Sequence, residues 1–414
     1  MKKLSFIAAL LIFVLALSAC TPPSDQSATT APAETDTKAP SGSATTDPSA
    51  SPEPSVSPVP YSFTTEDMAY PFWKSGIMRN EIITFQRGSD DSITAKLLFK
   101  PTSITCVMDN SLKITLKEGV HYSYDPANPK VLTWLPGDDE FVIPFFEKGD
   151  LTSAHQDNCG SSGIIGNCMY CVGPWLYEKQ LHITYTYDLS DFGATSSVAS
   201  YAGDKLPNTI SKLKNKEDLN LVIYGDSIFT GGDSSAQWNR EPFVPTFFNL
   251  LKDQLKALYG SKINMTNTSK GGEGAQWGAD NVEECVNAYN PDLVIIGFGM
   301  NDAQNNSVTE RDLIKQIMDA VSAKNPNCEF ILVATFVANP AIGWDVNQGS
   351  HYLGFKMLEE TGVVAMDMHK LHEYILFRKY YQDTTGNNLN HPNDWLARMY
   401  AMQLLSILYD YDAQ

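Results

Sequence analysis

Basic residues are scarce in this chain. Its 414 residues include 30 Lys and Arg against 48 Asp and Glu, which gives a formal net charge of -18. An acidic surface is repelled by the phosphate backbone of nucleic acids, and anionic glycans are disfavoured for the same reason. The composition therefore argues for no nucleic acid partner, and for a substrate that is neutral or enters a local pocket.

A hydrophobic run long enough to span a membrane is lacking at the N-terminus. The apolar stretch from Leu4 to Leu17 is shorter than the roughly 20 residues of a spanning helix, but it has the length of a signal peptide and follows two lysines. The stretch closes with Leu-Ser-Ala-Cys at residues 17–20. This resembles the bacterial lipoprotein signal, in which the cysteine, here Cys20, is lipidated after cleavage. An ordinary secretory signal is the alternative.

Large apolar residues are rare between Thr21 and Pro60, where Ser, Thr, Pro, Ala, Asp and Glu dominate. A segment without an apolar face to bury is expected to be a disordered tether. We therefore predict a signal peptide at 1–20, a tether at 21–60, a β-rich accessory domain at 61–205 and a catalytic domain at 206–414. The expected location is extracytoplasmic, with the membrane reached through the lipid on Cys20.

Cysteine is also infrequent, with 7 residues in the chain. Cys159, Cys168 and Cys171 could form a zinc site with His155, because Cys-x-x-Cys is a common spacing for thiolate ligands. A disulfide among the three cysteines is the competing interpretation outside the cell. Cys285 and Cys328 fall in predicted core elements.

Residues from about Tyr61 to Tyr187 show the alternation of short antiparallel strands separated by turns. This pattern predicts a β-sandwich, jelly-roll-like domain. Its aromatic residues are interpreted as core, with carbohydrate binding as the alternative. They are Phe72, Trp73, Trp134 and Trp175.

Beyond residue 205 hydrophobic strands alternate with helical stretches. The predicted strands are 221–224, 263–266, 293–296, 330–333 and 363–366. The predicted helices lie near 246–259, 281–289, 309–324, 352–360 and 395–408. Strands of this kind predict an α/β fold whose parallel sheet is covered by helices on both faces, with the loops after the strands forming one functional edge.

Four polar motifs follow these elements in order. They are Gly225-Asp226-Ser227, Gly271-Gly272, Gly299-Met300-Asn301-Asp302 and His391-Pro392. Together they resemble the SGNH (GDSL) hydrolase superfamily, over about residue 221 to the C-terminus. The resemblance implies a three-layer α/β fold with no cofactor and no catalytic metal.

The resemblance also implies a role for each motif residue. Ser227 would be the nucleophile and His391 its base, because a serine hydroxyl attacks well only when an imidazole takes its proton. The backbone N–H groups of Ser227 and Gly272 and the side-chain amide of Asn301 would form the oxyanion hole.

The chain departs from the family pattern at Asn388, where the family has an aspartate three residues before the histidine. An amide can orient imidazole but stabilises imidazolium less than a carboxylate does. The site is therefore either a Ser-His dyad oriented by a neutral group, which we favour, or a triad completed by Asp383 or Asp394.

These observations predict a surface-tethered serine esterase that removes small acyl groups, acetyl foremost, from polysaccharide. The architecture resembles bacterial carbohydrate esterases. A lipase, thioesterase or lysophospholipase of the same fold is one alternative. The other is a glycan-binding surface lipoprotein with a vestigial catalytic centre.

Overall fold

The computed structural model describes residues 63–413, apart from 138–140, 144–160 and 166–167. The side chains of residues 161–169, 345 and 346 are also outside the description. The predicted signal peptide, the tether, Cys20, His155 and Cys159 therefore lie outside the described residues. Within the described ranges, the helices all fall short of the length and apolarity needed to cross a membrane.

A five-stranded parallel sheet forms the centre of the C-terminal part, which we call the α/β part (residues 206–413). The strand order is β13-β12-β14-β15-β16. Their bounds are Leu219–Gly225 for β12, Ile263–Asn267 for β13, Leu293–Gly297 for β14, Glu329–Ala334 for β15 and Val363–Asp367 for β16. These strands contain the five predicted apolar runs, so the predicted parallel α/β architecture is confirmed.

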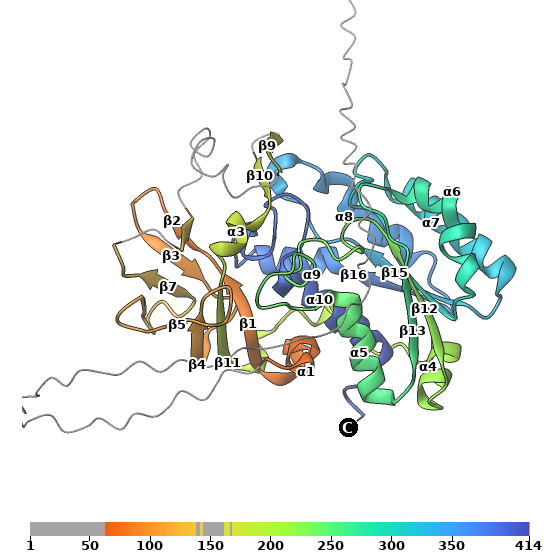
Figure 1. The fold of residues 1–414 in the computed structure, drawn as a ribbon, viewed down its shortest axis with the longest axis horizontal. Coiled ribbons are helices and arrows are strands. Elements are labelled where there is room, and N and C mark those ends of the chain that lie inside the picture. Colours follow the sequence, from red (N-terminus) through yellow and green to blue (C-terminus); the bar gives the residue numbers. More distant parts are fainter. Residues whose placement is uncertain (1–62, 138–140, 144–160, 166–167, 414) are drawn as a thin grey trace, which may run out of the picture. The chain divides into compact units, whose positions relative to one another are not determined.

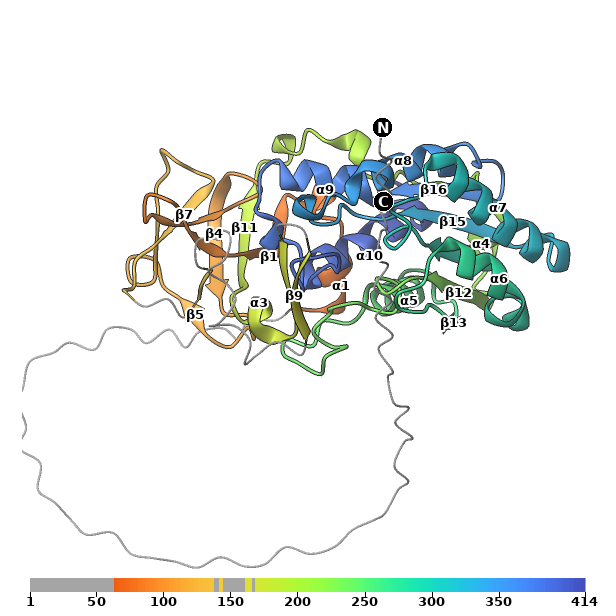
Figure 2. The ribbon, with the colours of Figure 1, turned by 90° about the horizontal axis from the view of Figure 1, so that it is seen from above.

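Alternate residues of the strands point to opposite faces of this sheet. Along β12, Leu221 and Ile223 join one hydrophobic cluster, whereas Val222 and Tyr224 join the other. Apolar side chains on both faces require cover on both sides, and helices provide it (Figures 1 and 2). Strands without a polar face therefore predicted correctly that helices cover both faces of the sheet.

Helices α4, α5, α9 and α10 contribute to the first cluster, and α6, α7 and α8 contribute to the second. Their bounds are Pro207–Lys214, Phe247–Tyr259, Met368–Leu376, Asp394–Leu408, Ala275–Cys285, Ser307–Lys324 and Asp345–Lys356, in that order. Helix α9 follows β16 directly and was not predicted. Helices α6 and α8 begin several residues earlier than predicted.

The N-terminal part, which we call the β-rich part (residues 63–205), contains two main sheets and a hairpin. Their strand orders are β1-β11-β4-β5, β6-β7-β3-β2-β8 and β10-β9. The strands are Ile77–Ile83, Phe85–Arg87, Ile93–Lys96, Pro101–Met108, Thr115–Leu116, Tyr122–Tyr124, Val131–Trp134, Val142–Ile143, Ser161–Ile165, Cys168–Val172 and Leu181–Tyr187 for β1 to β11. Pairing is antiparallel except between β2 and β8. The predicted antiparallel, sandwich-like class is confirmed.

Short helices α1 (Thr65–Ala69), α2 (Phe72–Ser75) and α3 (Pro174–Glu178) accompany these strands. The four aromatic residues weighed as carbohydrate ligands are buried, with Phe72 at 3% exposure and Trp134 at 7%. Trp73 and Trp175 are each 6% exposed. They are core residues, which agrees with the interpretation we favoured.

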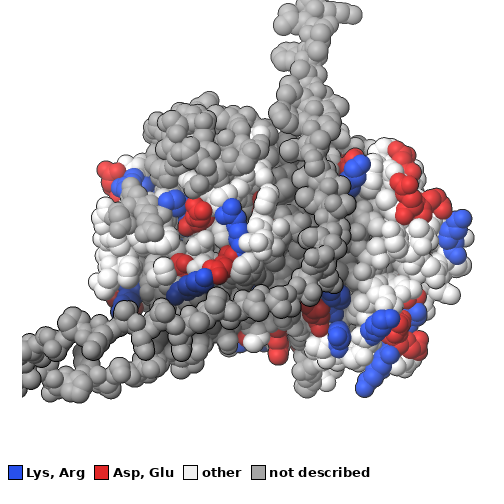
Figure 3. Space-filling model, viewed as in Figure 1, with Lys and Arg blue, Asp and Glu red and all other residues white. Residues whose placement is uncertain are grey.

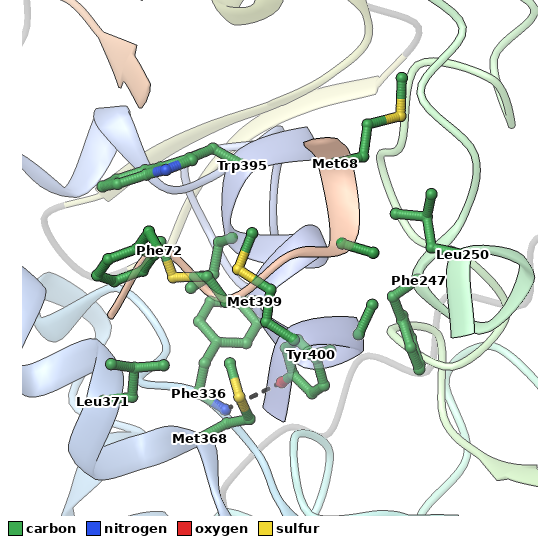
Figure 4. Close-up of a cluster of buried hydrophobic side chains, with 14 of the residues drawn as sticks. Met68, Phe72, Phe247, Leu250, Phe336, Met368, Leu371, Trp395, Met399 and Tyr400 are labelled. Carbon is green, nitrogen blue, oxygen red and sulfur yellow. Dashed lines mark hydrogen bonds between the residues drawn. The ribbon is translucent and has the colours of Figure 1, made fainter. Parts of the chain in front are cut away.

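The two parts share one hydrophobic cluster. Met68 of α1 and Phe72 of α2 pack with Phe247 of α5 and with Trp395 and Tyr400 of α10 (Figure 4). The whole segment from Pro60 to Gln414 is one compact unit. The two parts are therefore packed against each other through a common core.

A buried ionic cluster also joins the two parts. The ammonium group of Lys379, whose side chain is 0% exposed, lies 2.6 Å from Glu81 Oε1 and 3.4 Å from Asp383 Oδ2. It also donates to the carbonyl oxygens of Ile82 and Lys96 at 2.9 and 2.6 Å. The buried ammonium group is thus surrounded by oxygen atoms from both parts.

Charged side chains of both signs lie on the surface of both parts. On the face in Figure 3, Lys and Arg lie beside Asp and Glu over the β-rich part and over the α/β part. The ion pairs Lys315–Asp319 and Lys262–Asp218 are of this exposed kind. Such pairs contribute about 0–1 kcal/mol each, so the fold is held by its core.

Candidate active site

Ser227 stands at the carboxyl end of β12, which lies between β13 and β14 in the parallel sheet. Gly225, the last residue of that strand, has no room for a side chain, since a Cβ there would lie 2.4 Å from the carbonyl oxygen of Gly297. The carboxylate of Asp226 is fully buried and accepts hydrogen bonds from the backbone N–H groups of Ile228 and Met300, at 2.9 and 3.2 Å. Burial raises the pKa of Asp226 to about 7. The turn is thus fixed to the loop after β14, and Ser227 is left half-buried at the sheet edge.

His391 meets Ser227 across 164 positions of sequence. The distance from His391 Nε2 to Ser227 Oγ is 2.9 Å, which is a hydrogen bond. His391 lies just before α10, whose N-cap is Asn393. The predicted nucleophile and base are brought together.

Gly272 and Asn301, the predicted oxyanion donors, lie on the loops after β13 and β14. Adjacent Gly271 would place a Cβ 3.7 Å from Ser227 Cβ, so this loop runs beside the nucleophile. Gly272 has φ +80°, a conformation that favours glycine. The Asn301 amide donates to the carbonyl oxygen of Glu273 at 2.9 Å, which leaves it a second N–H. The two loops are therefore held at the same edge.

Asp302 connects the loop after β14 to the start of helix α6. Its carboxylate accepts from the backbone N–H of Ala275, the first residue of α6, at 3.2 and 3.1 Å. Burial raises the pKa of Asp302. The loop after β14 is thereby tied to the helix that follows the Gly272 loop.

Asp383 is not brought to His391. Its Oδ1 accepts from the backbone N–H and hydroxyl of Thr84, at 2.7 and 2.6 Å, while its Oδ2 faces Lys379. Among the other residues weighed, Asp394 accepts from Ser235 N at 2.8 Å, and the Asn388 amide oxygen accepts from Gln382 at 2.8 Å. The carboxylate of Asp383 therefore contacts Thr84 of the β-rich part instead of His391.

Within the described part of the chain, the carboxylate that faces His391 Nδ1 is Asp233. Its Oδ2 lies 3.4 Å from Nδ1, which is longer than an ordinary hydrogen bond. Both atoms are buried and make no hydrogen bond to another described residue. The other oxygen, Oδ1, accepts from the indole N–H of Trp238 at 3.0 Å. The geometry therefore differs from both the dyad and the Asp383 hypothesis.

The sequence reasoning missed Asp233 because it searched close to His391. Asp233 lies instead six positions after Ser227, in the loop Gly231-Gly232-Asp233. Burial is the largest single influence and lowers the pKa of His391, but the charge of Asp233, its contact with the ring and the charge of Asp226 together raise it, and the net shift is upward from 6.5. The one sequence feature that could have indicated this partner of His391 was an acidic residue in the loop that follows the nucleophile.

A metal site is not apparent among the described residues, which hold no group of three or more His, Cys, Asp and Glu placed to bind an ion. Cys171 is disulfide-bonded, to a partner that lies outside the described side chains. It is therefore unavailable to the zinc set that we had weighed. Cys106, Cys285 and Cys328 are free thiols.

Comparison with known proteins identifies the class. Residues 223–394, about two fifths of the chain, match the GDSL-like Lipase/Acylhydrolase family. This segment contains Ser227, Gly272, Asn301 and His391. The match supports the SGNH/GDSL hydrolase superfamily for this segment, as its motifs predicted.

Solved structures give similarities at low identity. A two-domain esterase active on acetylated mannans is 21% identical with a TM-score of 0.43, over 51% of this chain and 54% of its own length. A catalytic mutant of Axe2, an acetylxylan esterase from Geobacillus stearothermophilus, is 18% identical with a TM-score of 0.38, over 46% of this chain and 94% of its own. The chain thus spans about half the length of the mannan esterase. A search of curated proteins gives no match.

Proposed function

We propose that the protein is a serine esterase that hydrolyses small acyl esters, acetyl foremost, through an acyl-enzyme. The observation that carries this proposal is the 2.9 Å contact between His391 Nε2 and Ser227 Oγ at the end of β12. A hydroxyl becomes a useful nucleophile when an adjacent imidazole accepts its proton. The GDSL domain supports the hydrolase class, while the mechanism and the acyl group are our proposal.

Acylation begins as the Ser227 proton moves to His391 Nε2 and Oγ bonds to the ester carbonyl carbon. The carbonyl oxygen becomes an oxyanion, for which the N–H groups of Ser227 and Gly272 and the free N–H of Asn301 are the donors. The imidazolium then gives its proton to the departing alcohol as the C–O bond breaks. Water repeats the sequence on the acyl-enzyme and releases the acid and Ser227.

Asp233 takes the place of the family aspartate in this mechanism. During acyl transfer Nδ1 carries a proton and the ring carries positive charge, and the carboxylate 3.4 Å away stabilises both. We therefore propose a triad of Ser227, His391 and Asp233. Its carboxylate comes from the nucleophile's own loop, because the position of the family aspartate is occupied by Asn388.

For the substrate we propose an acetylated polysaccharide. The support is the architecture inferred from sequence, in which a β-rich part precedes the hydrolase domain behind an expected lipid anchor. An exposed aromatic beside the triad also suits a sugar, since Trp238 is 47% exposed while its N–H is bound to Asp233.

Turnover of an aryl acetate by wild type and Ser227→Ala tests the esterase proposal. We expect the variant to lose activity while keeping its fold. Near-wild-type turnover in a folded Ser227→Ala protein would overturn the nucleophile assignment. An acyl-length series separates a deacetylase from a lipase, and acetate release from acetylated mannan, xylan and cell-wall glycans tests the substrate.

The proposed location is the outer face of a bacterial cell membrane, with lipid on Cys20. The basis is the sequence of residues 1–20 alone. Labelled fatty acid should enter the wild-type protein and not Cys20→Ala. Equal labelling of the two proteins would remove the anchor from the proposal without touching the esterase.

A further inference from the structure

We propose that Gln180, a residue of the β-rich part, is a positioning residue for the catalytic histidine. The inference rests on the proposed function, because it assigns a role in placing His391. It extends that function by making the β-rich part a component of the catalytic centre.

Residues 384–393, which we call the histidine hairpin, fold back on themselves. The backbone N–H of Asn393 donates to the carbonyl oxygen of Thr384 at 3.1 Å, and the N–H of Gly386 donates to that of His391 at 3.0 Å. The Thr385 hydroxyl also donates to the His391 carbonyl oxygen, at 2.9 Å. The limb formed by residues 384–386 therefore sets the backbone position of His391.

Gln180 holds that limb from outside the α/β part. Its side-chain amide nitrogen donates to the carbonyl oxygens of Gln382, at 2.9 Å, and Thr385, at 2.7 Å. The residue is 0% exposed. Two carbonyl acceptors require an NH₂ group with both protons, so the orientation of the amide is fixed. Thr385 thus connects Gln180 on one side to His391 on the other.

The position of Gln180 is itself well determined. It directly precedes β11, which lies between β1 and β4 in its sheet. Its backbone N–H donates to the carbonyl oxygen of Tyr177 in α3 at 3.1 Å. A residue fixed between a helix and a central strand can transmit the rigidity of the sheet to the hairpin.

Two further contacts from the β-rich part reach the same region. Thr84 donates twice to Asp383 Oδ1, just before the hairpin. The backbone N–H of Cys171 in β10 donates to the carbonyl oxygen of Asn387 at 3.1 Å. Asn387 in turn receives the backbone N–H of His391 on its side-chain oxygen at 3.1 Å. The hairpin is therefore held at its start, limb and tip.

Catalysis depends on this support because His391 makes two contacts at once. Nε2 must stay near Ser227 Oγ while Nδ1 stays near Asp233. A misplacement of about 1 Å in a catalytic group can cost about 10²-fold in rate. Loss of the Gln180 donors frees the limb that carries the His391 carbonyl contacts.

The test is Gln180→Met in the full chain, which keeps the length and apolar bulk of the side chain and removes both donors. We expect kcat for an aryl acetate to fall roughly 10- to 100-fold, with KM little changed. The ascending pH limb of kcat should also move, since the His391–Asp233 contact is disturbed. Gln86→Met is the matched control: its amide donates to the Gln382 side chain and to Thr84, not to the backbone of the hairpin, and kcat should stay close to wild type.

A folded Gln180→Met protein with kcat and pH profile equal to those of Gln86→Met would overturn the inference. If Gln180→Met does not fold, Gln180→Asn replaces it, because its side chain is one methylene group shorter and withdraws the amide. Its kcat and pH profile are then compared with those of Gln86→Met. If wild type shows no Ser227-dependent hydrolysis, the proposed function fails instead. The placement of His391 is then followed by its ring resonances, and an unchanged titration in Gln180→Met would refute the positioning role.

Discussion

The nucleophile and its base are supported by different regions of the molecule. Ser227 depends on its own sheet: Gly225 ends β12, and Asp226 is bonded within the neighbouring turn and to the loop after β14. His391 depends on a hairpin whose outer side is held by the β-rich part, hundreds of positions earlier in the chain. One catalytic group is therefore fixed by contacts within the α/β part, and the other also by contacts from the β-rich part.

The largest effect should come from Asp233→Asn. The variant keeps the shape of the side chain but cannot stabilise imidazolium, so we expect kcat to fall by up to about 10⁴-fold. Asp394→Asn is the control, because that buried acid accepts from Ser235 N and should cost less than about tenfold. Stopped assays of aryl acetate turnover, with folding checked by circular dichroism, measure both. A collapse confined to Asp394→Asn would contradict the triad.

Asn301→Ala should have the next largest effect. It removes a side-chain donor on the nucleophile's side of the site, and loss of one oxyanion donor typically costs about 10²- to 10³-fold in kcat. KM should change little, because the donor acts on charge formed in the transition state. A loss below about threefold in a folded variant would remove Asn301 from the oxyanion hole.

Trp238→Phe tests the hydrogen bond that the indole N–H of Trp238 donates to the carboxylate of Asp233. We expect kcat to fall about tenfold, because a hydrogen bond to a charged acceptor is lost. An aromatic ring is kept, while the pyrrole part of the indole and its N–H bond to Asp233 are lost. Trp277→Phe, on α6 beside the Gly272 loop, is the matched change on the nucleophile's side and should stay within about twofold. Equal effects of the two substitutions would show that the Trp238 bond does not support Asp233.

The smallest shift is in pH dependence. Only neutral imidazole accepts the Ser227 proton, so activity rises as pH passes through the pKa of His391, which Asp233 holds above 6.5. The ascending limb of kcat/KM should therefore have its midpoint above 6.5 in wild type. In Asp233→Asn it should move to lower pH, because the charge of Asp233 then no longer opposes the burial that lowers the pKa of His391. A midpoint that does not move would place the charge partner elsewhere.

Much of the fold was predictable because its signals are local. Apolar runs such as Leu221 to Tyr224 mark strands buried on both faces, and the motif at Ser227 marks the turn that follows. Helix α9 was missed because it follows β16 without a linker. Only Asp367 separates the predicted strand at 363–366 from the first residue of α9, Met368, so no loop marked a new element.

The third member of the site could not be read in the same way. The candidates predicted from the sequence were a neutral group such as Asn388, and the carboxylates of Asp383 and Asp394, all of which lie close to His391 in the chain. The structure uses proximity in space: Gly386 of the histidine hairpin would place a Cβ 2.3 Å from Asp233 Cβ. That approach joins a loop near residue 233 to one near 386, and a local pattern does not encode it.

The buried ammonium group of Lys379 has a thermodynamic consequence. Lys379 and Asp383 belong to the α/β part and Glu81 to the β-rich part, so separating the parts would break the Lys379–Glu81 ion pair. Breaking a buried ion pair costs about 3–5 kcal/mol. This cost disfavours a state in which one part unfolds while the other persists. The segment from Pro60 to Gln414 should melt in a single cooperative transition, with calorimetric and van't Hoff enthalpies that agree.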